Sequence, residues 1–174
     1  MEYKLATSTW GSSEINAIQE VIKADKFSMG RKVEEFEEQF AQFFGSKYAI
    51  MCSSGSAANL LMVASLFYSK KPKLKSGDEI IVPAVSWSTT YFPLQQYGLK
   101  LKFVDIDIES LNYDLDALKS AVSSKTKAIM VVNLLGNSNN FKKINDIIKT
   151  KNIIVIEDNC ESMGAKFKDK FCGT

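Results

Sequence analysis

The feature that most constrains the fold is a series of short, nearly continuous runs of Val, Ile and Leu separated by helical patterns. The runs predict strands at residues 48–53, 79–83, 101–106, 128–134 and 153–157. Helices are predicted between them, at 56–68, 89–97, 115–122 and 141–150. Continuous apolar runs are typical of strands covered on both faces. Strands that alternate with helices favour a largely parallel sheet with helices on both sides, so we expect an α/β three-layer sandwich.

Two further helices are expected before the first strand. In residues 13–24 the isoleucines recur on one helical face, with Ser12 or Ser13 as the cap, and in residues 31–44 a stripe of phenylalanines does the same before Gly45 ends the helix. We expect the phenylalanine stripe to be a core face. The predicted organisation is an N-terminal arm and helix over 1–30, followed by an α/β domain over 31–174.

Composition excludes several classes of function. The 22 basic and 20 acidic residues leave a net charge of +2, which gives no electrostatic case for nucleic acid or an acidic membrane. No apolar run is long enough to span a bilayer. Cys52, Cys160 and Cys172 form no CxxC pattern and predict reduced thiols in a cytoplasmic protein. The chain has no histidine, so we expect no metal site based on histidine, no Ser-His-Asp triad and no histidine base within it.

Chemistry is expected where strands end, because ligands of such sheets bind beyond the carboxyl ends of the strands. The segment around Ser54, Gly55, Ser56 and Ala57 places a small turn directly before a helix, whose free N–H groups suit a phosphate. An ordinary Ser-capped helix explains the same residues equally well. The spacing is not that of a P-loop, and no GxGxxG is present.

Two other strand ends carry distinctive residues. Trp87 follows the strand that Pro83 closes, and its ring either lies over a planar ligand or covers the edge of the sheet. Residues 133–137, Asn-Leu-Leu-Gly-Asn, are interpreted as a plain turn.

The stretch VIEDNCESMG ends the last strand with adjacent carboxylates. Glu157 and Asp158 should point to opposite faces, because side chains alternate along a strand. A buried acid needs a positive partner, and no lysine or arginine lies nearby in sequence. A ligand could supply that charge, or the acid could form a surface salt bridge. A phosphate cradle, an aromatic plate and a buried acid together suit pyridoxal phosphate, whose ring nitrogen the acid would keep protonated.

These residues resemble a known family. The segments that carry the likeness are FGSKYAIMCSSGSAANLL, GDEIIVPAVSWSTTYFPLQQYG, LKFVDID, VNLLGN and IEDNCESMGAKF. From about Leu5 to Thr174 the chain resembles the DegT/DnrJ/EryC1/StrS family of pyridoxal-phosphate sugar aminotransferases. The resemblance implies the large domain of an aspartate-aminotransferase-like transferase, with the remaining strands and a small C-terminal domain absent.

Within the family, the chain looks most like members that dehydrate a nucleotide-linked 4-keto-6-deoxy sugar at C3, with GDP-4-keto-6-deoxymannose as substrate, in colitose and O-antigen biosynthesis. Aminotransferases of the family tend to carry His-Leu-Tyr-Gly at residues 133–136 and Gln at the position of Glu161, and both departures favour dehydration. The resemblance further implies L-glutamate as amino donor, a pyridoxamine phosphate form of the cofactor and a homodimer.

The resemblance assigns roles to matching positions. Gly55, Ser56 and Ala57 would bind the cofactor phosphate. Trp87 would stack on its ring, Asp158 would pair with its nitrogen, and Glu161 would lie close to it. The segment Lys26, Phe27 and Ser28 corresponds to one that touches the nucleotide sugar.

The family's catalytic lysine or histidine lies downstream of the EDNCE segment. We therefore expect this chain to be an N-terminal fragment that is inactive and poorly folded by itself, with exposed apolar faces. Two alternatives remain open: a nucleotide-sugar 4-aminotransferase of the perosamine type, and a non-catalytic remnant of the fold. An NAD-type Rossmann enzyme is a distant third.

Overall fold

The computed structural model describes residues 7–174, so the start of the predicted N-terminal arm lies outside the described residues. The chain divides into two compact units, Met1–Met51 and Cys52–Thr174. The predicted domain boundary after residue 30 stays a prediction. Among residues 7–174, no helix has both the length and the apolar character needed to cross a membrane.

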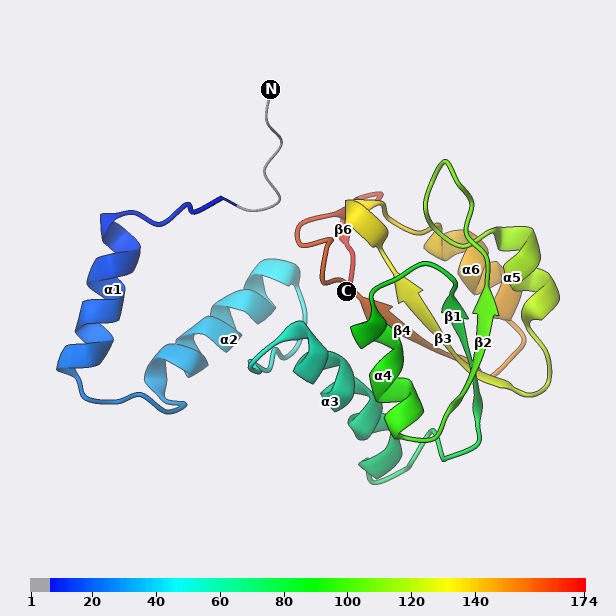
Figure 1. The fold of residues 1–174 in the computed structure, drawn as a ribbon, viewed down its shortest axis with the longest axis horizontal. Helices are drawn as coiled ribbons and strands as arrows, with labels where there is room; N and C mark the ends of the chain where they lie inside the picture. The colour runs from blue at the N-terminus through cyan, green and yellow to red at the C-terminus, as the bar shows by residue number, and fades with distance from the viewer. Residues whose placement is uncertain (1–6) are drawn as a thin grey trace. The chain divides into compact units, whose positions relative to one another are not determined.

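The first unit contains the two helices predicted ahead of the sheet. Helix α1 runs over Ser12–Lys23 and α2 over Arg31–Phe44 (Figure 1). The predicted serine cap of α1 is wrong: the cap is Gly11, whose amide donates to Glu14 Oε2 at 2.6 Å. Gly45 ends α2 as predicted, at a φ of 69° that only glycine adopts without strain.

The apolar stripes of these helices are present, but they do not form a core as expected. Helix α1 has no buried residue, and in α2 only Ala41 is buried. The rings of α2 pack on one another along the helix, with centroids of Phe36 and Phe40 5.5 Å apart, while Phe36 stays half exposed. Contacts within one helix cannot remove a whole apolar face from water, so the first unit keeps a large exposed apolar surface.

The second unit contains a four-stranded parallel sheet. Its strands are β1 (Glu79–Pro83), β2 (Lys100–Val104), β3 (Thr126–Val132) and β4 (Ile154–Asp158), in the order β2-β1-β3-β4. All three pairings are parallel. Four of the five predicted strands and the parallel arrangement are therefore confirmed.

The fifth predicted strand, residues 48–53, is wrong. The segment has no strand assignment, and Tyr48 and Ile50 are 75% and 77% exposed. An extended apolar segment becomes a strand only when a neighbouring strand satisfies its N–H and C=O groups. No strand among residues 7–174 pairs with this segment.

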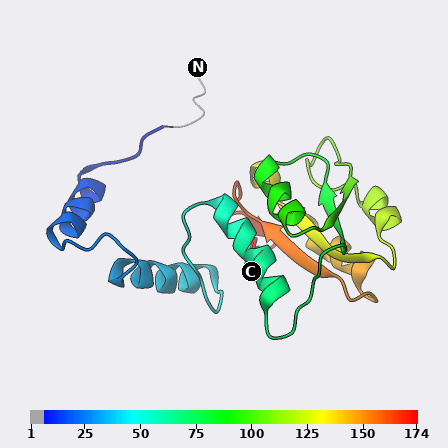
Figure 2. The same cartoon turned by 60° about the horizontal axis from the view of Figure 1, so that its bottom comes forward.

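Helices cover both faces of the sheet (Figures 1 and 2). Helices α3 (Gly55–Tyr68) and α4 (Ser88–Gln96) pack on one face, and α5 (Leu115–Ala121) and α6 (Phe141–Ile148) pack on the other. Neighbours along a strand divide between the two layers: Ile80 joins the core beneath α3 and α4, and Ile81 joins the core beneath α5 and α6. The predicted three-layer α/β sandwich is confirmed.

The strand order also predicts which edge of the sheet binds ligands. From β1 the chain passes through α4 to β2 on one side, and from β3 it passes through α6 to β4 on the other. The order therefore reverses between β1 and β3, and in open α/β sheets ligands bind outside the carboxyl ends of the strands at such a point. A short 3-10 turn, Leu134–Gly136, follows β3 at this edge, and a small hairpin of β5 (Lys166–Phe167) and β6 (Lys170–Phe171) follows β4.

Candidate functional site

A cavity of about 330 Å³ lies at this edge, where the ends of β1, β3 and β4 meet the first turn of α3. It brings together five of the predicted site residues, which come from three separate segments: Gly55, Ser56, Trp87, Asp158 and Glu161. The remaining lining residues, Asn59, Ser86, Thr89, Thr90, Val132, Leu134 and Cys160, were not predicted. Ala57 does not line the cavity, although it belongs to the same helical turn.

The chemical centre of the cavity is the buried carboxylate of Asp158, which is only 7% exposed. Its Oδ2 accepts from Asn59 Nδ2 at 2.9 Å and from Thr90 Oγ1 at 2.8 Å, and its Oδ1 accepts from the Cys160 amide at 3.1 Å. All three donors are neutral, and no ion pair in residues 7–174 involves this carboxylate. A buried, uncompensated negative charge suits a cationic ligand.

The predicted alternation at the end of β4 is confirmed. Glu157 faces the other side of the sheet, where its Oε2 accepts from the Gly173 amide at 2.7 Å beside Phe141 of α6. The two adjacent carboxylates thus serve different layers, and only Asp158 reaches the cavity.

The first turn of α3 shows the predicted serine cap and leaves its role in phosphate binding a prediction. Ser54 is the N-cap, and its Oγ accepts from the Ala57 amide at 3.2 Å, as in an ordinary Ser-capped helix. The amides of Gly55 and Ser56 precede that bond, and the first amides of a helix have no intrahelical acceptor. A Cβ at Gly55 would lie 3.4 Å from Cys160 Sγ, so the helix start is packed closely against the loop after β4. This end can hold an anion at the cavity.

Trp87 lies at the N-cap position of α4 and lines the cavity with its side chain 71% exposed. A ring this exposed does not seal the edge of the sheet, so the alternative structural role is not supported. It leaves a large aromatic surface beside Asp158 for a planar ligand.

Sequence reasoning missed Asn59 and Thr90, the two side chains that hold Asp158. Asn59 is 4% exposed and Thr90 is 1% exposed. One signal was available: Asn59 is a lone amide in an otherwise apolar and small-residue helix, GSAANLLMVASLFY. A buried amide must find a hydrogen-bond partner.

The segment interpreted as a plain turn, residues 133–137, is tied firmly to the loop after β4. Asn133 is 1% exposed, and its Nδ2 donates to Asn159 Oδ1 at 2.8 Å. The Leu135 amide donates to Glu161 Oε2, also at 2.8 Å. The 133–137 segment and the loop that carries Glu161 therefore contact each other.

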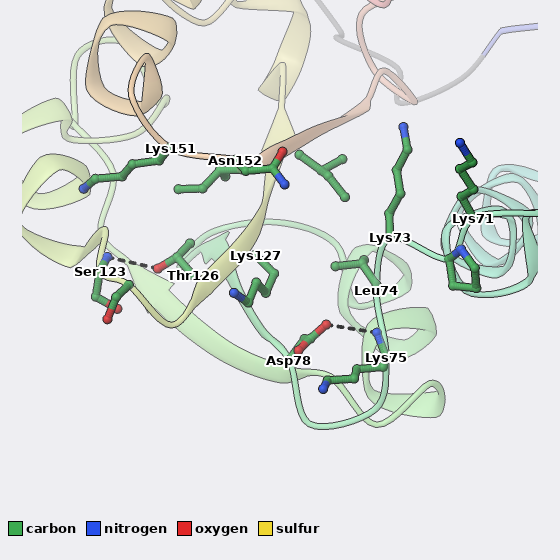
Figure 3. Close-up of a pocket in the computed structure, with 14 residues that line it drawn as sticks. Lys71, Lys73, Leu74, Lys75, Asp78, Ser123, Thr126, Lys127, Lys151 and Asn152 are labelled. Atoms are coloured by element: carbon green, nitrogen blue, oxygen red, sulfur yellow. Dashed lines mark hydrogen bonds between the residues drawn. The ribbon is translucent and has the colours of Figure 1, made fainter.

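A larger hollow of about 890 Å³ lies at the opposite end of the sheet, beside the starts of β1, β3 and β4 (Figure 3). Its lining includes five lysines, Lys71, Lys73, Lys75, Lys127 and Lys151. Its single acid is Asp78, whose Oδ2 accepts from the Lys75 amide at 2.9 Å. Figure 3 shows the side chains of Lys73 and Lys151 extending in different directions. The hollow contains no aromatic residue and no buried carboxylate, so it is not the candidate catalytic site.

The predicted substrate segment, Lys26, Phe27 and Ser28, lies in the first unit between α1 and α2 and is exposed. Its contact with a sugar nucleotide stays a prediction.

Comparison with known proteins gives close relatives. The chain is 64% identical over all 174 residues to the GDP-4-keto-6-deoxy-D-mannose 3-dehydratase of Escherichia coli O55:H7 and covers 45% of that protein. It is 61% identical to the protein of the same name from Yersinia pseudotuberculosis, again over its whole length, and covers 44% of it. GDP-perosamine synthase of Escherichia coli O157:H7 is 33% identical over 84% of the chain, which covers 39% of that relative. The chain thus spans less than half the length of the curated relatives it matches.

A solved structure of the Escherichia coli dehydratase with bound hydrated pyridoxal phosphate superimposes with a TM-score of 0.97 at 64% identity, over 99% of this chain and 44% of that one. The fold is thus part of the α/β fold of pyridoxal-phosphate-dependent aminotransferases. The family model of the DegT/DnrJ/EryC1/StrS aminotransferases matches residues 9–174. The chain belongs to this family.

Proposed function

We propose that this chain forms the cofactor-binding part of an enzyme that uses pyridoxal and pyridoxamine phosphate to remove the C3 hydroxyl of a nucleotide-linked 4-keto-6-deoxy sugar. The substrate is GDP-4-keto-6-deoxymannose, and L-glutamate is the amino donor. The observation that carries this proposal is the Asp158 carboxylate, which is buried at the cavity, accepts from three neutral donors and forms no ion pair within residues 7–174.

The residues present fit the cofactor. The amides of Gly55 and Ser56 would hold its phosphate at the positive end of α3, and Trp87 offers a face for its ring. Asp158 would pair with the protonated ring nitrogen, which supplies the cation that its surroundings lack. When bound, the cofactor acts as an electron sink that stabilises negative charge developing on the substrate.

Within the cavity, the chain's residues bind and orient rather than transfer the proton. Asn59 and Thr90 both donate to Asp158 Oδ2, and the Cys160 amide donates to Oδ1, so the carboxylate needs no rearrangement to meet a cationic ring. No lysine lines the cavity in residues 7–174, and the sequence has no histidine. We place the proton-transferring group in the part of the relatives' length that this chain does not span.

The 64% identity to a dehydratase against 33% to a perosamine synthase supports dehydration over 4-amination. The Glu161 and Asn133–Gly136 motifs, which meet in space, support the same choice. We extend the proposal to a cytoplasmic homodimer that acts in O-antigen sugar biosynthesis. The free cysteines support the compartment, and a relative named as a lipopolysaccharide biosynthesis protein supports the pathway. The homodimer rests on the family resemblance alone.

Cofactor titration tests the binding half of this proposal. Pyridoxal phosphate is added to the full-length protein that carries this chain, and absorbance and tryptophan fluorescence are followed. Asp158→Asn removes one charge from a charged hydrogen bond of about 1.5–3 kcal/mol, so affinity should fall roughly 10- to 100-fold. The control Asp114→Asn changes an aspartate that caps α5 away from the cavity. Equal affinity in both variants would refute the role of Asp158.

Product analysis tests the chemistry. The full-length protein is incubated with the keto sugar, pyridoxal phosphate and glutamate. Release of ammonia with a 3-deoxy keto sugar supports dehydration. A stable 4-amino sugar would instead establish the aminotransferase, and no turnover of either kind would favour the non-catalytic remnant.

A further inference from the structure

The turn after β3 is held by the residues that directly follow Asp158. Asn159, one residue beyond it, accepts from Asn133 Nδ2, and Glu161, three residues beyond it, accepts from the Leu135 amide. Both donor–acceptor distances are 2.8 Å. The same short loop therefore carries the Asp158 carboxylate of the cavity and forms two hydrogen bonds with the turn after β3.

The turn after β3, Leu134–Gly136, is strained. Leu135 has φ 52° and ψ 27°, the left-handed conformation that a residue with a Cβ adopts at a cost. Gly136, which follows it, also has positive φ, but glycine bears no such penalty. The Leu135 side chain is 69% exposed, so burial does little to offset the strain. Two backbone hydrogen bonds close the turn, from the Gly136 amide to the Asn133 carbonyl and from the Asn137 amide to the Leu134 carbonyl. The bond from the Leu135 amide to Glu161 adds a side-chain contact at the strained residue itself.

The turn also forms part of the cavity wall. Val132 and Leu134 line the cavity on either side of Asn133. Asn133 cannot follow a movement of the turn, because its Oδ1 also accepts from the Asn139 amide at 2.9 Å. If the Leu135 backbone relaxed, the resulting shift would therefore mainly move Leu134, which lies between the fixed Asn133 and the strained Leu135.

We propose that Glu161 is a positioning residue: its carboxylate holds Leu135 in the left-handed conformation and so keeps Leu134 in the wall of the ligand cavity. The identity of the ligand rests on the proposed function above. Glu161 then acts through the backbone of the turn. A substitution that relieves the strain at Leu135 should therefore restore the ligand binding that is lost with the Glu161 side chain.

Rescue by glycine tests this directly. In the full-length protein, Glu161→Ala should weaken pyridoxal phosphate binding about tenfold, and Glu161→Gln, which keeps an acceptor oxygen, should stay within about threefold of the unaltered protein. Adding Leu135→Gly to Glu161→Ala should restore most of the affinity, because glycine adopts positive φ without strain. If this double variant binds as weakly as Glu161→Ala, Glu161 acts on the ligand itself and the proposal is overturned.

The matched control is Leu111→Gly in the same Glu161→Ala background. Leu111 is also left-handed, at φ 58°, but its amide donates to the Asp107 carbonyl and it does not line the cavity. Leu111→Gly should not restore pyridoxal phosphate binding. A rescue by Leu111→Gly equal to that by Leu135→Gly would show a general gain in stability and overturn the proposal.

Amide hydrogen exchange tests the hydrogen bond between Glu161 and the Leu135 amide without any ligand. Exchange at Leu135 should accelerate at least tenfold in Glu161→Ala and stay unchanged in Glu109→Ala, which alters an exposed acid elsewhere. Unchanged exchange in Glu161→Ala would overturn the proposal whatever the ligand. Failure of the unaltered protein to bind pyridoxal phosphate would count against the proposed function alone.

Discussion

Thr90→Val probes the hydrogen bonds that hold Asp158. The substitution replaces a hydroxyl with a methyl group of similar size on a side chain that is 1% exposed. It removes the 2.8 Å donor to Asp158 Oδ2 and the 2.9 Å contact with Ser86 Oγ. Because the shape of the side chain is kept, the effect reports the lost hydrogen bonds rather than a cavity.

The hydrogen bonds around Asp158 determine how much stability Thr90→Val should lose. A hydrogen bond to a charged group contributes about 1.5–3 kcal/mol. Asp158 Oδ2 keeps its bond from Asn59 Nδ2, so it is not left without a partner, and the expected cost lies at the lower end. We expect the free energy of unfolding to fall by about 1.5 kcal/mol, roughly tenfold in the unfolding equilibrium.

The assay is urea unfolding of the full-length protein followed by circular dichroism, together with pyridoxal phosphate titration. Thr126→Val is the matched control, since Thr126 is also buried and donates to a carboxylate, Glu79 Oε1, at 2.8 Å, but at the opposite end of the sheet. Both variants should lose stability, and only Thr90→Val should also weaken cofactor binding. A loss below about 0.5 kcal/mol for Thr90→Val, or equal weakening of binding by Thr126→Val, would refute the reasoning.

Three further predictions follow from single side chains. Trp87→Leu should abolish the quenching of tryptophan fluorescence by pyridoxal phosphate with little change in melting temperature. Trp10→Leu should preserve the quenching, although Trp10 is also largely exposed. Gly55→Ala should weaken competition by inorganic phosphate at the cavity, because the added methyl group narrows the start of α3, while the melting temperature should change little. Burial raises the pKa of Tyr113 well above its usual 10.0, and its hydroxyl donates to the Met130 carbonyl. The folded state therefore binds this proton more tightly than the unfolded state, so its stabilisation is complete below pH 10 and is lost as the pH rises further. Urea unfolding between pH 8 and 11 should show a shallower alkaline loss of stability in Tyr113→Phe, and an identical slope would contradict the assignment.

The predictions that held depend on local periodicity. The bounds of α2 and β1 were predicted to the residue, because the phenylalanine spacing and Gly45 define one and the apolar run before Pro83 defines the other. The opposite orientation of Glu157 and Asp158 follows from the two-residue repeat of a strand. The strand predicted at residues 48–53 was wrong because periodicity alone does not make a strand. Their pattern is that of a strand, but a strand also needs a neighbouring strand to pair with.

The sequence by itself determined the alternation of strands and helices, the parallel α/β class and the presence of a carboxylate at the end of β4. It could do so because these properties depend on side-chain periods and on residues a few positions apart. The tertiary structure alone decided what that carboxylate touches. Its partners Asn59 and Thr90 lie 99 and 68 positions away, and they reach Asp158 only because α3 and α4 pack on the same face of the sheet. Likewise, a turn of ordinary composition became a strained wall of the cavity only when folding brought the Glu161 carboxylate within 2.8 Å of the Leu135 amide.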